Sequence, residues 1–481
     1  MIALLLLGSL CEPIQTPTPP PPDSAVLRVT PIRYELTVRI DYAQQRLDGT
    51  ARITLRNFSA TPVTEVPLQL YRLMEIRAAD VNGTPAPWTQ RVVGVSDFSK
   101  LQVTQASVTL PRPLPPGGTV DLQVRYDGHL LGYAETGMAY VRDHIDPSFT
   151  ILRDDALAFP QVGYPSMAAN RRAPFPSYDY LARITVPESL VVVNGGRLVE
   201  RTAAAGWATY VYRSVKPSWR MDFAIGDYAV IDVRPIRVAY LRRDSVGARR
   251  IAASARRSLD LFTAWFGKLP GDPSLTIVEL EDGYGSQADV AAIMQTAAAF
   301  RDSTRDHELY HEVSHLWNPP AKDLPSPRWN EGLASFLEDL VEEQFTGRPV
   351  AGKRADQLLD WLRSIASRRE RLTRVPLIHY GKEQMTDFSY SEGALLFHLL
   401  YGVVGPERFR AIIGGFSRQY ATTGASTTDF VAFASRTAPM DLKQLFDDWV
   451  YTTGWWPAIK DGATYAELVR RYQAAARHST R

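Results

Sequence analysis

The feature that most constrains the fold is a change of hydrophobic period near residue 235. Before it, apolar and polar residues alternate in short runs, and the run 34–40 (YELTVRI) is typical of a half-buried strand. After about Ala252, apolar residues recur every three or four positions, as they do on one face of a helix. Further strand-like runs lie near 51–55, 68–73, 102–110, 119–126, 181–186, 190–193 and 207–213. Later helical runs lie near 304–317, 328–344, 355–370, 391–403, 406–420 and 463–477, with strand-like runs only near 274–280 and 290–296.

This order predicts a multidomain β + α chain, in which a large antiparallel β-sheet domain precedes a mainly helical domain. We expect a leader and proline-rich spacer over 1–25, the β-rich domain over 26–235, the helical domain over 236–455 and a helical tail over 456–481. A chain of 481 residues is long enough for two large hydrophobic cores.

Charge and cysteine content exclude several classes of function. The 54 basic and 52 acidic residues nearly cancel, so bulk charge predicts no nucleic-acid partner. The one cysteine, Cys11, excludes an intrachain disulfide framework and a metal site built from cysteines.

The chain begins with an apolar stretch, MIALLLLGSL, which is too short to span a bilayer and has the length of a signal-peptide core. Cys11 follows it directly, and PIQTPTPPPPDS then forms a proline-rich spacer. We expect an exported protein of a bacterial-type cell envelope or periplasm, or a secreted one. Two interpretations of Cys11 stay open: a lipid anchor to the membrane, or an ordinary leader cysteine. Because no basic residue precedes the stretch, a cytoplasmic chain is a third alternative.

The motif that carries chemistry is HELYHEVSHLW at 307–317, which places three of the eight histidines within nine residues. Histidines four apart on a helix point the same way and can hold one Zn²⁺, and a glutamate after the first can act as a base toward a water at the metal. Two registers overlap: His307 with His311, or His311 with His315 and Glu312 as the base.

A zinc site needs a third protein ligand and one open position. Prolines 319, 320, 325 and 327 end the first helix and force a loop, and a second helix begins around RWNEGLASFLEDL. Glu331, in the first turn of that helix, is the natural third ligand. We therefore predict one Zn²⁺ per chain.

These residues resemble the zinc aminopeptidases of the membrane alanyl aminopeptidase type, within the gluzincins. His311-Glu312-Val313-Ser314-His315, Trp317 and Asn330-Glu331-Gly332 match the family's HExxH motif, the tryptophan after it and its NEG glutamate. The tryptophan offset favours the downstream register. The upstream register gives a loop length to Glu331 nearer the family's. Weaker similarity covers about 26 to 455.

The resemblance implies a thermolysin-like catalytic domain and peptide substrates. It also implies a catalytic tyrosine, matched by Tyr390 in YSEGA, which would stabilise the oxyanion. The family's glutamate that holds the substrate amine is missing: GYGSQADVAAIMQT places Ser286 or Gln295 there, depending on the alignment. An acid within 279–282 is a candidate substitute.

The sequence thus predicts a zinc metallopeptidase that is aminopeptidase-like. His311, His315 and Glu331 hold the metal, Glu312 is the general base and Tyr390 assists. One alternative is a zinc endopeptidase or other amidohydrolase without aminopeptidase specificity. A second is a non-catalytic envelope binding protein that retains the fold. His307 and Glu308 are expected either to hydrogen-bond to the groups around the site or to face solvent.

Overall fold

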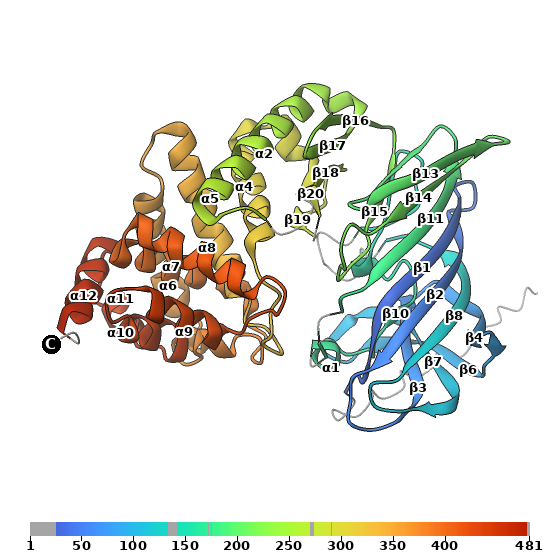
Figure 1. Ribbon diagram of the computed structural model, residues 1–481, viewed down its shortest axis with the longest axis horizontal. Coiled ribbons are helices and arrows are strands. Elements are labelled where there is room, and N and C mark those ends of the chain that lie inside the picture. The colour runs from blue at the N-terminus through green and yellow to red at the C-terminus, as the bar shows by residue number, and fades with distance from the viewer. Residues whose placement is uncertain are drawn as a thin grey trace, which may run out of the picture.

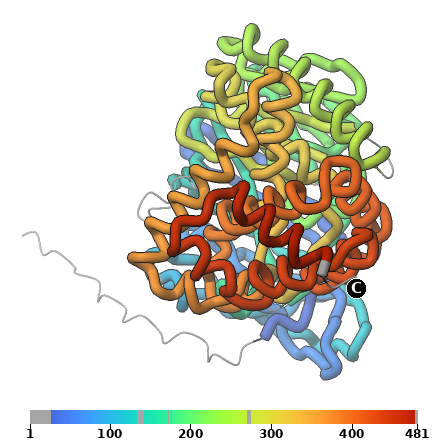
Figure 2. Tube along the Cα trace, turned by 90° about the vertical axis from the view of Figure 1, so that its left-hand side faces the viewer, coloured from blue at the N-terminus to red at the C-terminus, as the bar shows by residue number. Residues whose placement is uncertain are grey.

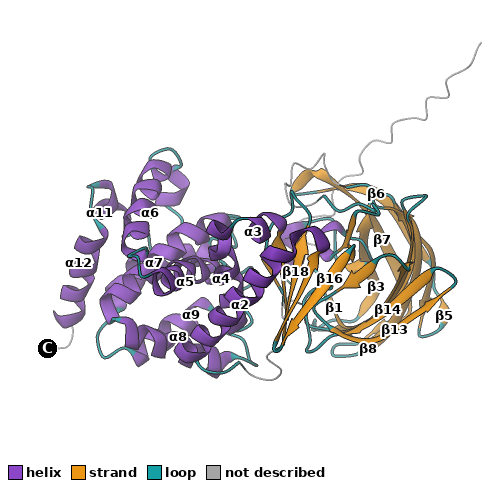
Figure 3. Ribbon diagram, turned by 90° about the horizontal axis from the view of Figure 1, so that it is seen from above, coloured by secondary structure: helices purple, strands orange, loops and turns teal. Residues whose placement is uncertain are grey.

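The computed structural model describes residues 26–132, 142–171, 173–174, 176–269, 274–289 and 291–478. The expected leader with Cys11, and the last three residues of the expected tail, lie outside them. A β-rich part and a helical part lie side by side, and a small sheet of the helical part faces the β-rich part (Figures 1 and 3). The predicted fold class is confirmed.

The β-rich part contains three sheets of described residues. They have the strand orders β13-β14-β11-β1-β2-β8-β4-β5, β10-β3-β7-β6 and β12-β15-β9. Within them the pairings are antiparallel except for the parallel pair β1–β11. The strands are β1 (Val29–Asp41), β2 (Arg46–Asn57), β3 (Val63–Tyr71), β4 (Met74–Val81), β5 (Thr84–Pro85), β6 (Trp88–Val95), β7 (Phe98–Leu114), β8 (Thr119–His129), β9 (Phe149–Leu152), β10 (Gln161–Val162), β11 (Asp179–Pro187), β12 (Val191–Val193), β13 (Arg197–Ala204), β14 (Trp207–Arg213) and β15 (Phe223–Gly226), and a short helix is α1 (Met167–Arg171).

The alternation in β1 has the expected cause. Tyr34, Leu36, Val38 and Ile40 are buried in one large hydrophobic cluster, while the residues between them are exposed or half-buried. One face of the central strand thus forms the core of the β-rich part.

The helical part begins with a five-stranded sheet in the order β16-β17-β18-β20-β19. These strands are β16 (Tyr228–Val233), β17 (Ile236–Leu241), β18 (Leu275–Leu280), β19 (Gln287–Ala288) and β20 (Ala292–Thr296). The sequence predicts β18 and β20. It does not separate β16 from the β-rich part, although β16 pairs with β17. It also misses β17, which begins directly after the expected boundary at residue 235, and β19, whose two residues are too few to show a period.

The helices account for most of the rest of this part. They are α2 (Ser245–Phe266), α3 (Ala297–Arg301), α4 (Asp306–Ser314), α5 (Trp329–Thr346), α6 (Ala351–Ala366), α7 (Ser389–Val404), α8 (Pro406–Tyr420), α9 (Thr427–Thr437), α10 (Lys443–Phe446), α11 (Trp456–Lys460) and α12 (Tyr465–His478). Figure 2 looks onto the side that faces away from the β-rich part, where the C-terminal helices lie. None of the described helices combines the length and apolar character needed to cross a bilayer.

Helices α5 and α7 approach each other very closely at two glycines. A Cβ added to Gly332 would lie 2.4 Å from the backbone of Gly393, so the contact has no room for a side chain. The crossing brings the first turns of both helices together, and with them Glu331 and Tyr390. Small residues at this crossing therefore position the candidate site.

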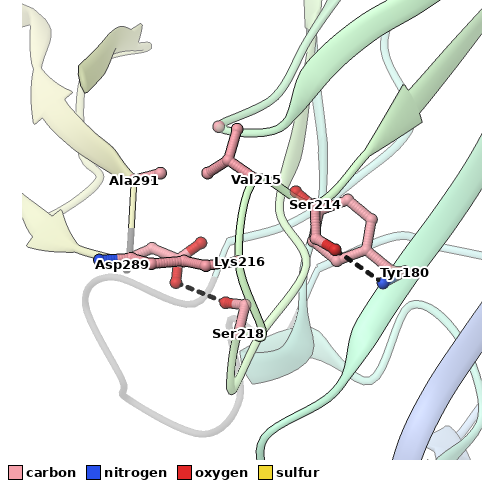
Figure 4. Close-up of a pocket in the computed structure, with 8 residues that line it drawn as sticks. Tyr180, Ser214, Val215, Lys216, Ser218, Asp289 and Ala291 are labelled. Atoms are coloured by element: carbon pink, nitrogen blue, oxygen red, sulfur yellow. Dashed lines mark hydrogen bonds between the residues drawn. The ribbon is translucent and has the colours of Figure 1, made fainter. Parts of the chain in front are cut away.

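Polar contacts join the two parts of the chain. Ser218 Oγ donates to Asp289 Oδ1 at 2.7 Å, beside a small hollow that Tyr180, Lys216 and Ala291 also line (Figure 4). None of the three expected zinc ligands lines this hollow.

Candidate metal centre

The first two expected ligands come from α4 and from the turn of 3₁₀ helix that continues it, His315–Trp317. The rings of His311 and His315 lie side by side, with centroids 5.0 Å apart. Both side chains are partly exposed. The spacing of four residues thus places both imidazoles on one face, as expected.

Glu331, in the first turn of α5, completes the group. Its Oε2 lies 3.5 Å from His311 Nε2 and 3.4 Å from His315 Nε2. A tetrahedral zinc with ligands at about 2.0–2.1 Å requires ligand atoms roughly 3.4 Å apart. These distances therefore fit a single zinc ion. The ligand atoms of the three residues lie within 4.8 Å of one another, which is close enough to share one metal.

Each of the two histidine rings also has a polar contact at its Nδ1 atom. His311 Nδ1 lies 3.0 Å from Glu338 Oε2, and the side-chain amide of Asn318 lies 2.7 Å from His315 Nδ1. An acceptor at Nδ1, such as Glu338, orients a ligating imidazole and leaves Nε2 for the metal. Asn318 acts in the same way when its amide oxygen, instead of its nitrogen, faces the Nδ1–H of His315. Sequence reasoning did not find Glu338. The signal available was its position seven residues after Glu331, on the same face of α5.

The pKa values of His311 and Glu331 are both shifted, and the shift of Glu331 keeps a negative charge where a cation would bind. Burial lowers the pKa of His311, but hydrogen bonds to Glu331 and Glu338 outweigh it and raise that pKa to about 10. Burial raises the pKa of Glu331, but the two histidines and Arg328 hold it well below its usual range. The carboxylate is thus ionised, and a metal would displace the proton from His311.

Glu312 follows His311 and is 8% exposed. Burial raises the pKa of its carboxyl group, against the opposing effect of the neighbouring histidines. A raised pKa suits a group that first accepts and then returns a proton.

Tyr390, at the start of α7, stacks on His311 with ring centroids 6.1 Å apart and planes 12° from parallel. Its side chain is 38% exposed, and burial of the rest raises the pKa of the phenol. Arg328 Nη2 donates to Glu331 Oε1 at 2.6 Å and lies 3.5 Å from the Tyr390 hydroxyl. Arg328 has a φ of +60°, which is rare for a residue with a side chain. Sequence reasoning missed this arginine.

Both candidates for the amine-binding position lie together. Gln295 Nε2 donates to Ser286 Oγ at 3.0 Å, and both residues lie within hydrogen-bonding distance of Glu308 on α4. The sequence left open whether Glu308 forms hydrogen bonds or faces solvent, and in the structure it forms hydrogen bonds.

The acids 279–282, expected as candidate substitutes, have other partners. Glu279 is fully buried and accepts from the backbone N–H of Leu241 at 2.8 Å. Glu281 pairs with Arg243, and Asp282 pairs with Arg301. Glu279 is the register partner of Gln295 in the β18–β20 pairing, but the carboxylates of these three acids are held by the partners just named.

The structure also bears on the two registers. His311, His315 and Glu331 form the metal-ligating group, whereas His307 Nδ1 lies 3.0 Å from the backbone oxygen of Thr304. The downstream register thus gives the group that can hold a metal.

Comparison with known proteins gives sequence relatives of one kind. No family model matches the sequence. Aminopeptidase M1-B of Oryza sativa subsp. japonica is 23% identical over 341 residues, which cover 63% of this chain and 37% of the relative. Aminopeptidase M1-D of the same organism is 22% identical over 460 residues, covering 88% and 50%. The chain thus spans half or less of the length of these relatives.

A solved structure matches over nearly the whole chain. The M1 zinc metallopeptidase from Deinococcus radiodurans, in a mutant bound to a Tyr-Ser-Ala substrate, superimposes with a TM-score of 0.65 at 20% identity. The match covers 88% of this chain and 94% of that one. The resemblance seen in the sequence is therefore confirmed: this chain has the fold of the two-domain M1 zinc metallopeptidases, and its sequence relatives are M1 aminopeptidases.

Proposed function

We propose that this chain is a zinc-dependent metallopeptidase that hydrolyses peptide bonds in an aminopeptidase-like reaction. The observation that carries the proposal is the group of His311, His315 and Glu331, in which Glu331 Oε2 lies 3.5 and 3.4 Å from the two histidine Nε2 atoms. Glu312 and Tyr390 lie beside this group. The sequence relatives are aminopeptidases, and the Deinococcus structure holds a peptide substrate, which supports a peptide as the substrate class.

In this proposal His311, His315 and Glu331 hold one Zn²⁺, with Arg328 on the second oxygen of Glu331. When bound, the metal polarises the substrate carbonyl and makes a water molecule a stronger nucleophile near neutral pH. Glu312 takes the proton of the attacking water and passes it to the leaving amine. Tyr390 donates its hydroxyl hydrogen to the oxygen that becomes negative.

Metal analysis and hydrolysis together test this function. The purified protein should contain one zinc per chain and should hydrolyse aminoacyl-anilides. A chelator should abolish the hydrolysis and added zinc should restore it. The matched variants His315→Ala and His307→Ala test the register, since the first should lose the metal and the second should keep it. Metal-free protein with unaffected hydrolysis would contradict the proposal.

The second candidate is a zinc endopeptidase or other amidohydrolase, which the neutral Gln295 favours because it carries no charge for a substrate amine. An enzyme of this kind would cleave N-acetylated peptides as well as free ones. Comparing the two substrates distinguishes the candidates.

We also propose export to a cell envelope or periplasm, with Cys11 as the candidate site of a lipid anchor. The support is the apolar stretch before Cys11 and the proline-rich spacer after it, which lie outside the described residues. Mass spectrometry of the mature N-terminus tests the proposal. A diacylated Cys11 would support it, and a mature chain that begins beyond residue 11 would contradict the anchor.

A further inference from the structure

Glu308 has one carboxylate oxygen that is firmly held and one that is weakly bound. Oε1 accepts from Arg305 Nε at 2.7 Å. Oε2 has three neutral neighbours at long distances: Ser286 Oγ at 3.3 Å, Thr296 Oγ1 at 3.3 Å and Gln295 Nε2 at 3.4 Å. The side chain is 21% exposed. The second oxygen can therefore accept a stronger donor.

Gln295 adds an unused acceptor next to this oxygen. The residue is fully buried, and its Oε1 has no hydrogen-bond partner in the part of the chain that the structure describes. A buried amide oxygen without a donor is costly, so it indicates a missing partner. Glu308 Oε2 has only distant neutral donors, so together with Gln295 Oε1 it leaves spare acceptor capacity beside a carboxylate that Arg305 pairs through its other oxygen. An ammonium group supplies both a positive charge and three donors.

The position of Glu308 on α4 limits which amine fits. It precedes Glu312 by four residues, which is about one helical turn, or roughly 5.4 Å along the axis. In a peptide the nitrogen of a residue lies about 2.5 Å from its own carbonyl carbon. A hydrogen bond from that nitrogen adds about 2.9 Å. The α-amine of the residue whose carbonyl is attacked is the substrate amine nearest to the reacting atoms, so it is the one best able to approach a carboxylate one turn from the base.

We propose that Glu308, together with Gln295, receives the free α-ammonium group of the substrate and confines cleavage to its first residue. The inference rests on the proposed peptidase function and deepens it by naming the substrate class. The carboxylate comes from the zinc helix itself, one turn before the base, instead of from β20. Arg305 orients it by holding the other oxygen.

Four forms of the full-length chain test this inference: wild type, Glu308→Gln, the control Glu281→Gln, and the double exchange Gln295→Glu with Glu308→Gln. Glu281 is a suitable control because it is a similarly exposed glutamate whose carboxylate pairs with a different arginine, Arg243. For each form, kcat/KM is measured with leucyl p-nitroanilide and with its N-acetylated form, and bound zinc is measured in parallel.

Glu308→Gln should lower kcat/KM for the free-amine substrate by about 10- to 100-fold, through a rise in KM. The acetylated substrate should change by less than about threefold, and the zinc content should not change. The double exchange should recover most of the lost preference for the free-amine substrate over the acetylated one, because it moves the carboxylate from residue 308 to the neighbouring side chain 295. The control should behave as wild type.

Binding provides a reading that does not depend on turnover. In a Glu312→Gln background, Tyr-Ser-Ala should bind about 10- to 100-fold more tightly than N-acetyl-Tyr-Ser-Ala, and adding Glu308→Gln should remove the difference. An unchanged preference, or an equal loss for both substrates, would overturn the role of Glu308 while leaving the peptidase function intact. Absence of zinc and of hydrolysis in wild type would instead contradict the peptidase function, and the peptide-binding ratio would still decide the amine site.

Discussion

Tyr390 contacts the metal group through both its ring and its hydroxyl. The ring stacks on His311, and the hydroxyl lies 3.5 Å from Arg328 Nη2. A phenol so placed can donate to a developing oxyanion, and loss of one such donor typically costs about 10²- to 10³-fold in kcat.

Tyr390→Phe should therefore lower kcat by about 10²- to 10³-fold with little change in KM or in bound zinc. Steady-state kinetics and metal analysis measure this. Tyr401→Phe is the matched control, since Tyr401 lies on the same helix and packs against Phe336 and Phe409. A Tyr390→Phe enzyme with wild-type kcat would remove the hydroxyl from the mechanism.

At the scale of elements, the crossing of α5 and α7 makes the site. Gly332→Ala would place a Cβ against the Gly393 backbone, so it should destabilise the protein by about 1–3 kcal/mol and lower activity as Glu331 and Tyr390 move apart. Gly352→Ala on α6 is the control, because outside the neighbouring backbone of its own helix nothing lies within 4 Å of the added Cβ. Thermal denaturation measures the melting temperatures of both variants, and Gly332→Ala should have the lower one. Equal melting temperatures would contradict the close approach of α5 and α7.

The strand β18 carries a carboxyl group with a strongly shifted pKa. Burial, reinforced by the neighbouring Asp244, raises the pKa of Glu279 to about 9. Because the folded pKa lies above the unfolded value, this group contributes stability that is complete below about pH 4.5 and is lost as the pH rises toward 9.

Glu279→Gln should therefore flatten the fall in stability between pH 5 and pH 9 and make the protein about 1–3 kcal/mol more stable than wild type at pH 9. Denaturant unfolding at several pH values measures this. The half-buried Glu281, replaced by Gln, should leave the wild-type profile unchanged. A Glu279→Gln profile parallel to wild type would show that Glu279 does not titrate in this range.

At the scale of the whole molecule, Arg220 joins the β-rich part to the helical part. It is 3% exposed, pairs with Asp222 at 2.6 Å and with Asp155 at 2.8 Å, and donates to Gln287 Oε1 on β19 at 3.3 Å.

Arg220→Ala should cost about 3–5 kcal/mol, because it leaves buried carboxylates without their cation. Arg242→Ala breaks an exposed pair with Asp227 and should cost at most about 1 kcal/mol. Denaturant unfolding compares the two variants, and similar costs would mean that the buried pair adds nothing to the junction.

Much of this architecture could be predicted from the sequence. Long periodic runs such as α2, α5 and α8 were predicted because their apolar faces repeat over several turns. The zinc group was predicted because its two histidines are local and its glutamate follows in the next helix.

The missing parts are contacts between distant residues. Glu338, Arg328 and the approach of Glu308 to Gln295 depend on how α4, α5 and β20 pack, and no local spacing encodes that packing. Likewise, β16 pairs with β17 across a turn at the position where the hydrophobic pattern predicts a domain boundary.

The central claim is that Glu312 acts as the base beside a zinc held by His311, His315 and Glu331. The most direct test compares wild type with Glu312→Gln for bound zinc and for hydrolysis of leucyl p-nitroanilide. The account predicts one zinc per chain in both proteins and a loss of kcat of at least about 10²- to 10⁴-fold in the variant. Equal hydrolysis by the two zinc-loaded proteins would contradict it.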